Sequence, residues 1–223
     1  MFTVFATAFD LNIFIKKLKI IFMKNLKLYL LSASMLLTVN LFAQKFKTSG
    51  VSYGVKAGIN IANIAIEPSD ATVSQKSIIG FNAGVFATLP IALGFAIQPE
   101  LLYSGLGTRA TTGGQSVDIK LDYITLPVLA KYKIIGTGLG IYIGPQVGYI
   151  LSSKAKAGGV SVDVDDSFKK ADFSGIGGVD YALPLGLSLS ARYQLGLVNI
   201  AKEASGDESA KNNAFTLSLG FSF

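Results

Sequence analysis

Bulky apolar residues alternate with small or polar residues along much of this chain, and the alternation is strictest at its end. Between Phe215 and Phe223 every odd position is phenylalanine or leucine, and every even position is threonine, serine or glycine. Side chains of a β-strand point alternately to opposite faces of a sheet, so a period of two predicts a strand with two different faces. One face must therefore lie in an apolar environment.

Eight alternating segments follow one another after residue 50. They cover residues 51–61, 77–89, 94–105, 117–134, 138–151, 171–183, 187–198 and 212–223. Their lengths reach or exceed the about 9–11 residues of a tilted membrane-spanning strand, whereas strands of soluble proteins average about 5–6 residues. The segments are therefore predicted strands that are long enough to cross a membrane.

The connections between the predicted strands alternate in length. Short uncharged turns at 90–93, 135–137 and 184–186 alternate with long connections that hold much of the charge, at 62–76, 106–116, 152–170 and 199–211. Short turns at one rim and long loops at the other are the plan of a transmembrane barrel. We therefore predict an all-β fold for residues 51–223, an eight-stranded antiparallel up-and-down transmembrane β-barrel.

The composition of the two faces predicts which one meets lipid. One face is bulky and apolar, and the other is rich in glycine, serine and glutamine, which suit a crowded interior better than a water-facing surface. A lysine or arginine on the lipid face costs about 2–4 kcal/mol at the bilayer midplane. The strand charges Lys56, Glu100 and Arg192 all fall on the small, polar face. We therefore expect the apolar face to point outward into lipid.

The segment at 117–134 departs from a single alternation. Its apolar positions run through Leu121 and then shift by one residue from Ile124 onward. Such a phase change predicts a β-bulge near residues 122–124. With that shift, Lys131 and Lys133 are expected to face the lumen or the near rim.

Four charged residues form the candidate interior site: Lys56, Glu100, Asp180 and Arg192. An unpaired buried charge is very costly, so we expect these residues to form a network of ion pairs and hydrogen bonds that fills the barrel. Eight strands leave room only for side chains or one small ligand. A conduction path or gate is the alternative interpretation.

Residues 23–43 have the parts of a cleavable signal peptide. Lys24 and Lys27 form a positive start, an apolar stretch of about 15 residues follows, and Ala43 supplies a small residue before the expected cleavage at Gln44. The apolar stretch is shorter than the about 20 residues of a spanning helix. Residues 44–50 are then a short periplasmic segment. Residues 1–22 precede this complete signal peptide, which indicates a start codon assigned upstream of the true one.

Composition excludes several kinds of site. The chain has no cysteine, which removes disulfides and cysteine-based metal sites, and no histidine, which removes the commonest general base and metal ligand. The formal charge of +6 comes mostly from the leader, because 15 basic and 13 acidic residues follow from Gln44 onward. We expect no enzymatic activity, no cofactor and no nucleic-acid partner.

One acidic loop is a weak candidate for a divalent cation. Asp163, Asp165 and Asp166 lie close together in the sequence, but the loop lacks the glycine and distant glutamate of an EF-hand. A solvated acidic loop is the alternative interpretation.

Seven stretches resemble a known family, the small outer-membrane β-barrel proteins that include the PorT-like group. These stretches are "YGVKAGINIA", "GFNAGVFATLPI", "IQPELLYSGLG", "LDYITLPVLAKY", "GLGIYIGPQVGYIL", "DFSGIGGVDYAL" and the terminal "NAFTLSLGFSF". The resemblance implies an eight-stranded barrel in a Gram-negative outer membrane. It also implies that the terminal aromatic residue, Phe223, is the signal read by the barrel-assembly machinery.

The leading functional hypothesis is a non-enzymatic outer-membrane barrel with a filled lumen and long surface loops, acting in envelope structure or interaction. Its expected partners are outer-membrane lipids and lipopolysaccharide, and the barrel-assembly machinery during biogenesis. Three alternatives stay open: an accessory barrel of a protein-secretion machinery, an outer-membrane lipid-modifying enzyme, which the absence of histidine disfavours, and a soluble barrel that binds an apolar ligand.

Overall fold

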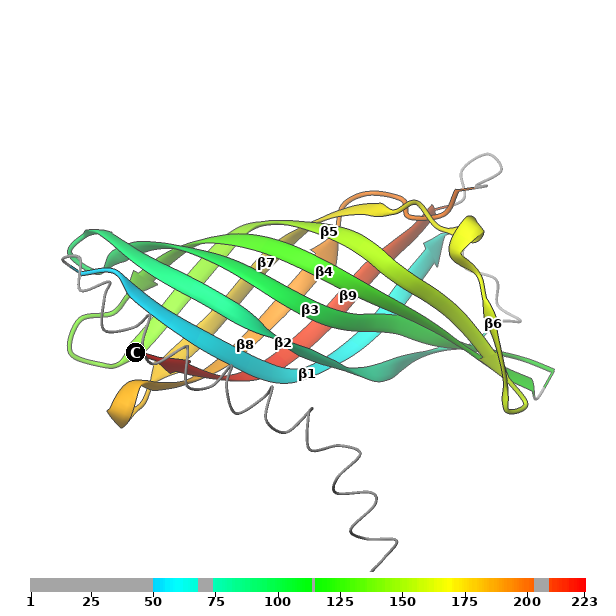
Figure 1. The fold of residues 1–223 in the computed structure, drawn as a ribbon, viewed down its shortest axis with the longest axis horizontal. Coiled ribbons are helices and arrows are strands. Elements are labelled where there is room, and N and C mark those ends of the chain that lie inside the picture. Colours follow the sequence, from blue (N-terminus) through cyan, green and yellow to red (C-terminus); the bar gives the residue numbers. More distant parts are fainter. Residues whose placement is uncertain (1–49, 68–73, 114, 203–208) are drawn as a thin grey trace, which may run out of the picture. The chain divides into compact units, whose positions relative to one another are not determined.

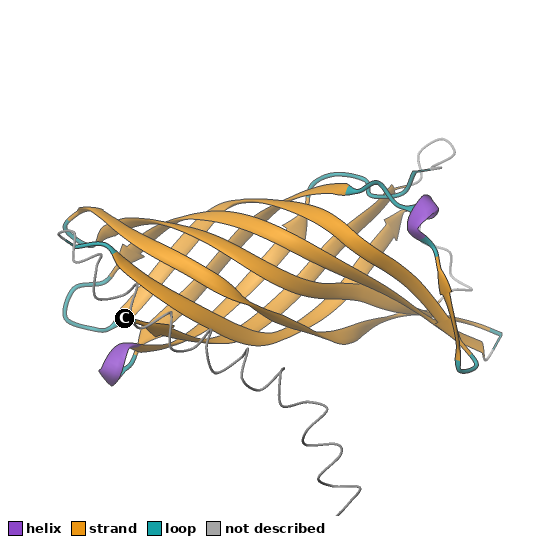
Figure 2. Cartoon of the chain, in the orientation of Figure 1, coloured by secondary structure: helices purple, strands orange, loops and turns teal. Residues whose placement is uncertain are grey.

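The computed structural model describes residues 50–67, 74–113, 115–202 and 209–223. The predicted signal peptide at 23–43, the preceding residues 1–22 and residues 44–49 lie outside these ranges. The described strands are β1 Ser52–Glu67, β2 Ser74–Ala92, β3 Phe95–Thr112, β4 Gln115–Lys133, β5 Leu139–Ala157, β6 Val160–Asp163, β7 Ala171–Ala182, β8 Leu187–Gly196 and β9 Ser209–Ser222. Two single-turn 3-10 helices, η1 Asp165–Ser167 and η2 Pro184–Gly186, lie in connections (Figure 2). No helix among the described residues has the length and apolarity needed to cross a membrane.

Eight of the strands close into an antiparallel ring (Figure 1). Neighbours along the sequence pair with each other, β5 pairs with β7, and β1 pairs with β9. The β1–β9 seam runs from Gly54 opposite Ser222 to Glu67 opposite Ser209, so the alternating end of the chain closes the barrel. The short strand β6 folds back on β5 as a hairpin outside the ring. The prediction of an eight-stranded up-and-down barrel is confirmed.

The strands reach farther toward the long-loop rim than the sequence predicted. β3 continues to Thr112 and β4 begins at Gln115, so the prediction of a long loop at 106–116 was wrong. The prediction at 62–76 was too long as well, because β1 continues to Glu67 and β2 begins at Ser74. These extensions carry polar residues on the outer face. They therefore lack the alternation of apolar and polar residues from which the strands were predicted. The cross-strand ladder tolerates such residues where the wall faces water.

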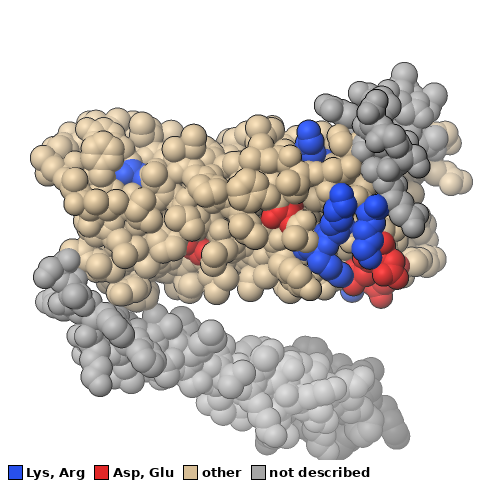
Figure 3. Space-filling view, turned by 90° about the horizontal axis from the view of Figure 1, so that it is seen from above, with Lys and Arg blue, Asp and Glu red and all other residues tan. Residues whose placement is uncertain are grey.

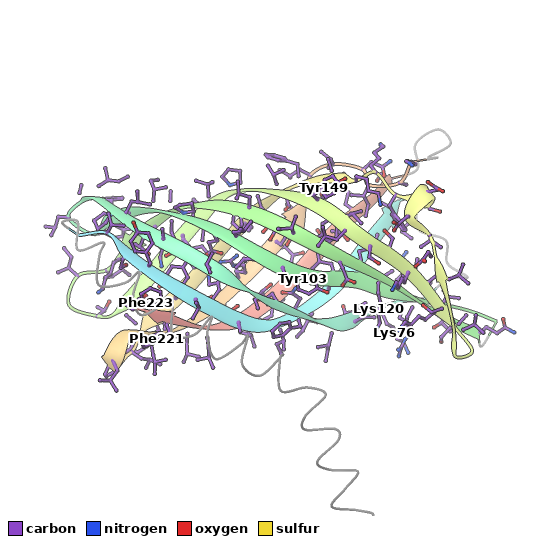
Figure 4. The ribbon with its side chains drawn as sticks, in the orientation of Figure 1. Lys76, Tyr103, Lys120, Tyr149, Phe221 and Phe223 are labelled. Carbon is purple, nitrogen blue, oxygen red and sulfur yellow. The ribbon has the colours of Figure 1, made fainter. Side chains whose placement is uncertain are left out.

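The two faces of the wall differ as expected. Apolar side chains on the outside are exposed, such as Leu189 at 49%, Leu217 at 44% and Ile143 at 69%. Figure 4 shows side chains projecting outward along the wall, and on the face drawn in Figure 3 charged residues are sparse toward the short-turn end and gather toward the long-loop end. Lys56, Glu100 and Arg192 are buried inside. A band of exposed apolar side chains around a polar interior is the arrangement of a barrel that spans a bilayer.

The predicted bulge lies on a different strand from the one expected. Along β4 the alternation is continuous, and Leu121, Tyr123 and Thr125 all point inward and are buried. The register between β4 and β5 shifts between Asp122 opposite Ser152 and Tyr123 opposite Ile150, which leaves the extra residue on β5. The change of apolar positions along β4 therefore has another cause, which is a change in the interior from polar to apolar toward the long-loop rim.

Candidate functional site

Glu100 on β3 is the centre of a buried network inside the barrel. Its Oε1 accepts hydrogen bonds from Lys56 Nζ and from Gln98 Nε2, both at 2.7 Å. Its Oε2 accepts a hydrogen bond from Arg192 Nη2 at 2.8 Å. Glu100 is 2% exposed, so the carboxylate has exchanged water for these donors. The structure thus brings together three of the four charges expected in the lumen.

Asp180, the fourth expected residue, joins the network through a lysine. Lys131 Nζ lies 3.0 Å from Asp180 Oδ2 and donates to Gln98 Oε1 at 2.9 Å. Lys131 and Arg192 also lie over the same aromatic ring, 5.8 Å and 5.5 Å from the ring centroid of Tyr142. These contacts are within the range of cation–π attraction. Lys131 was expected to face the lumen or the near rim, but its role as the partner of Asp180 was not predicted.

A second set of polar side chains fills the lumen farther toward the long-loop rim. Asn60 donates to Ser104 Oγ at 2.8 Å and accepts hydrogen bonds from Asn82 at 3.0 Å and Thr216 at 2.8 Å. Four strands thereby contribute to one cluster. Small polar residues on the inward face were its only signal in the sequence.

An apolar plug closes the lumen at the long-loop rim. The plug consists of buried inward residues from five strands and one residue from a connection: Ala62, Ile64, Leu106, Leu121, Tyr123, Ile150, Ala210, Ala214 and Ile200. Ile200 follows β8, is 0% exposed, and is fixed by backbone hydrogen bonds from Lys169 N to its carbonyl at 2.8 Å and from its amide to Ala210 O at 2.9 Å. This plug was not predicted, because the alternation in the sequence indicates a small or polar interior along the whole barrel.

A cavity of about 370 Å³ lies at the opposite, short-turn end of the lumen. Its walls include Lys56, Lys131, Asp180 and Tyr142, and its mouth is formed by the short turns, with Gly138 and Gly186 among them. The charged network therefore forms the inner end of a space that opens on one rim. Beyond it, the polar cluster and the apolar plug occupy the rest of the lumen.

The acidic loop residues do not converge on a common point. Asp165 accepts a hydrogen bond from Ser153 N at 2.7 Å and forms an ion pair with Lys170 at 3.1 Å, while Asp166 pairs with Lys202 at 3.8 Å. The lysine lowers the pKa of Asp165 below its ordinary value, and the backbone hydrogen bond adds to this effect. Asp163 lies on β6, opposite Lys154. Among the described residues no group of three potential ligands is arranged to hold a metal ion.

The chain end is tied into the seam of the barrel. The backbone amide of Phe223 donates to Tyr53 O at 2.9 Å, and the rings of Phe221 and Phe223 lie 6.3 Å apart. Figure 4 shows both phenylalanines at one end of the barrel, whereas Tyr103 and Tyr149 lie near its middle, on the long-loop side of the phenylalanines. Aromatic side chains near both ends of an apolar wall correspond to the two interfacial girdles of membrane barrels.

Comparisons with known proteins agree with this architecture. Residues 42–202 match the family described as outer membrane protein beta-barrel domain. A comparison with curated protein sequences gives no match. Among solved structures, Neisserial surface protein A is 17% identical over 78% of this chain and 100% of that chain, with a TM-score of 0.53. Ail, the attachment invasion locus protein of Yersinia pestis, is 13% identical over 78% and 99% with a TM-score of 0.46, and OprG from Pseudomonas aeruginosa is 12% identical over 77% and 95% with a TM-score of 0.41. At these identities the likeness concerns the fold alone.

Proposed function

The chain belongs to the outer membrane protein beta-barrel domain family, and from this premise we propose that it is a non-enzymatic outer-membrane barrel with a closed lumen. In this proposal its wall and its long-loop rim act in envelope structure and surface interaction. Outer-membrane lipids and lipopolysaccharide are the molecules it contacts. The barrel-assembly machinery reads its terminal Phe223 during biogenesis.

The observation that carries this proposal is the filling of the lumen. Three layers follow one another from the short-turn rim: the ion network around Glu100, the polar cluster around Asn60, and the apolar plug that includes Ile200. An eight-stranded barrel is just wide enough for side chains to fill its interior. A protein filled in this way has its surfaces, rather than a channel, available for function.

Three measurements test the proposal. Outer-membrane fractionation with a heat-modifiability gel should place the protein in the outer-membrane fraction, and the unboiled and boiled forms should migrate differently. Planar-bilayer recordings of the same preparation should show no large, stable conductance. A large conductance would contradict a closed lumen. Mass spectrometry of lipid A from a deletion strain should show no change, and an altered lipid A structure would contradict the non-enzymatic role.

We also propose the PorT-like group as the subgroup of this chain. The support is the set of seven resembling stretches, two of which form the β1–β9 seam that closes the ring. An accessory role in protein secretion would follow from this assignment. Comparing the proteins secreted by wild-type and deletion strains tests it, and identical secretion profiles would count against it.

A further inference from the structure

The outer wall carries basic side chains on the long-loop side of its tyrosines. Tyr103 on β3 lies opposite Ile124 on β4, which lies opposite Tyr149 on β5, so the two tyrosines belong to one row across the wall. Lys120 lies four residues before Ile124 on β4, on the side of the long-loop rim. At a rise of about 3.3 Å per residue and a tilt of about 40°, this places Lys120 about 10 Å beyond the tyrosine row. Figure 4 shows Lys120 and Lys76 on that side of Tyr103.

We name the basic belt by its four members: Lys76 on β2, Lys120 on β4, and Lys154 and Lys156 on β5. All four are exposed on the outside of the wall. Lys120 lies directly opposite Lys154 in the antiparallel ladder. Directly opposed side chains on one face have Cβ atoms about 4.5–5.5 Å apart, and like charges in that position are destabilising. The wall therefore holds a repulsive pair at a place where many neutral residues would fit.

The belt has acidic neighbours but forms no ion pair with them within the described part of the chain: Asp118 lies opposite Lys156 in the β4–β5 ladder and is already engaged by Arg109. Other basic residues near this rim are paired: Arg109 with Asp118, Lys170 with Asp165, and Lys202 with Asp166. No ion pair among the described residues involves a member of the belt. Asp163 lies opposite Lys154 in the β5–β6 hairpin, but the two are not among the ion pairs of the described residues. An anion from outside the chain would relieve the repulsion between Lys120 and Lys154.

We propose that the basic belt is a binding site for the phosphate groups of lipid A in the surrounding lipopolysaccharide. This rests on the proposed function, because the belt meets lipopolysaccharide only when the barrel spans the outer membrane with its long loops outside. The anionic headgroups of the outer leaflet lie just beyond the apolar core, which is where the belt lies relative to the tyrosine row. Ammonium groups donate short, charge-assisted hydrogen bonds to phosphate oxygens, and several such groups on adjacent strands give one phosphate more than one donor. The ligand neutralises the opposed charges of Lys120 and Lys154, which form no ion pair within the described part of the chain.

A pair of double variants with equal charge change tests this site. Lys120→Gln with Lys154→Gln removes the opposed pair of the belt. Lys170→Gln with Lys202→Gln removes the same charge from lysines that already have acidic partners, and serves as the matched control. Each purified protein is titrated with three probes in mixed micelles: phosphorylated lipid A, enzymatically dephosphorylated lipid A, and phosphatidylglycerol.

The wild-type protein should bind phosphorylated lipid A more tightly than either other probe. The belt variant should lose about tenfold in affinity for that probe, and the control should stay within about twofold, because its lysines are engaged within the chain. Equal binding of dephosphorylated lipid A would overturn the phosphate assignment, equal binding of phosphatidylglycerol would overturn the choice of lipid A, and an equal loss in the control would overturn the choice of residues. Heat-modifiability gels of each variant establish that it is folded. Failure of lipid A binding by a folded outer-membrane protein defeats this inference alone, whereas absence of the wild-type chain from the outer membrane defeats the proposed function.

Discussion

Replacing Glu100 by glutamine should destabilise the barrel strongly, although the two side chains have nearly the same shape. Glu100 is 2% exposed and accepts three hydrogen bonds, two of them from the cations Lys56 and Arg192. Removing one partner of a buried ion pair leaves the other charge uncompensated and costs about 3–5 kcal/mol. Glu100→Gln leaves two such cations around a neutral amide, so we expect the free energy of unfolding to fall by an amount in that range.

Lys56→Met provides the contrast that identifies charge as the cause. This change leaves Glu100 and Arg192 as a balanced pair, and it removes one hydrogen bond and a cation–π contact of 5.6 Å between Lys56 and the Phe86 ring. The expected cost is about 1–3 kcal/mol, smaller than that of Glu100→Gln. In the Glu100→Gln background the same change should be stabilising, because it then removes one of two uncompensated cations. The sign of the effect of Lys56→Met should therefore reverse between the two backgrounds.

Equilibrium unfolding in urea, with the protein folded into bilayers, measures these free energies. The chain has no tryptophan, so the loss of β-structure is followed by circular dichroism and by heat-modifiability gels. Matching transitions by the two methods are needed for a two-state analysis. A cost of less than about 1 kcal/mol for Glu100→Gln, or a further loss of stability when Lys56→Met is added to it, would refute the reasoning.

Three other predictions concern the two rims. Ile200→Asp places an unpaired carboxylate in the apolar plug and should speed proteolysis of the connection after β8. Ile200→Val should lower the free energy of unfolding by only about 0.5–1.5 kcal/mol. Equal proteolysis rates for the two variants would contradict the plug. Deleting Phe223 should lower the amount of barrel recovered from the outer membrane, and undiminished recovery would count against its role as an assembly signal. Arg109 donates two hydrogen bonds to Asp118 and holds the pKa of that carboxyl below its ordinary value. The contribution of this pair to stability is therefore complete above the ordinary carboxyl range and is lost as the pH falls through the lowered pKa, so the difference in unfolding free energy between wild type and Asp118→Asn should vanish on acidification. A difference that stays constant with pH would show that the charge of Asp118 does not stabilise the fold.

The sequence predicted the ring of strands because the wall is exposed to lipid along most of its length. Lipid requires an apolar outer face, and the narrow lumen requires small or polar residues, so the alternation is visible at every crossing. Alternate positions along a strand point to opposite faces, and this rule placed Lys56, Glu100 and Arg192 on the inward face, where the structure joins them by ion pairs. The pairing of Asp180 with Lys131 could not be read in this way. It depends on which residues of β4 and β7 reach the same height inside the ring. The alternation along one strand tells which face a residue is on, but not its height relative to residues of another strand.

The errors of the sequence analysis all fall near the long-loop rim, where the wall leaves the bilayer. There the outer face carries residues such as Lys120 and Asp118, and the inner face carries Leu121 and Ile150. An alternation search that assumes an apolar outer face reads this as a change of phase, which is why a bulge was predicted on β4. The actual irregularity lies on β5 and leaves no pattern in β4.

The position of the apolar plug follows from the solvent around each part of the barrel. Burying an apolar side chain is favourable only when the alternative is exposure to water. Within the bilayer the outer wall already has an apolar solvent, so moving apolar residues to the lumen gains little there. Beyond the tyrosine row the outside of the wall is aqueous, and apolar residues such as Leu106 and Ile64 are stabilised by turning inward. Near the long-loop rim the barrel thus has an apolar core, as a soluble protein has. Within the bilayer the same sheet has its apolar residues on the outside and its polar residues in the lumen. The apolar plug therefore forms where the strands leave the membrane.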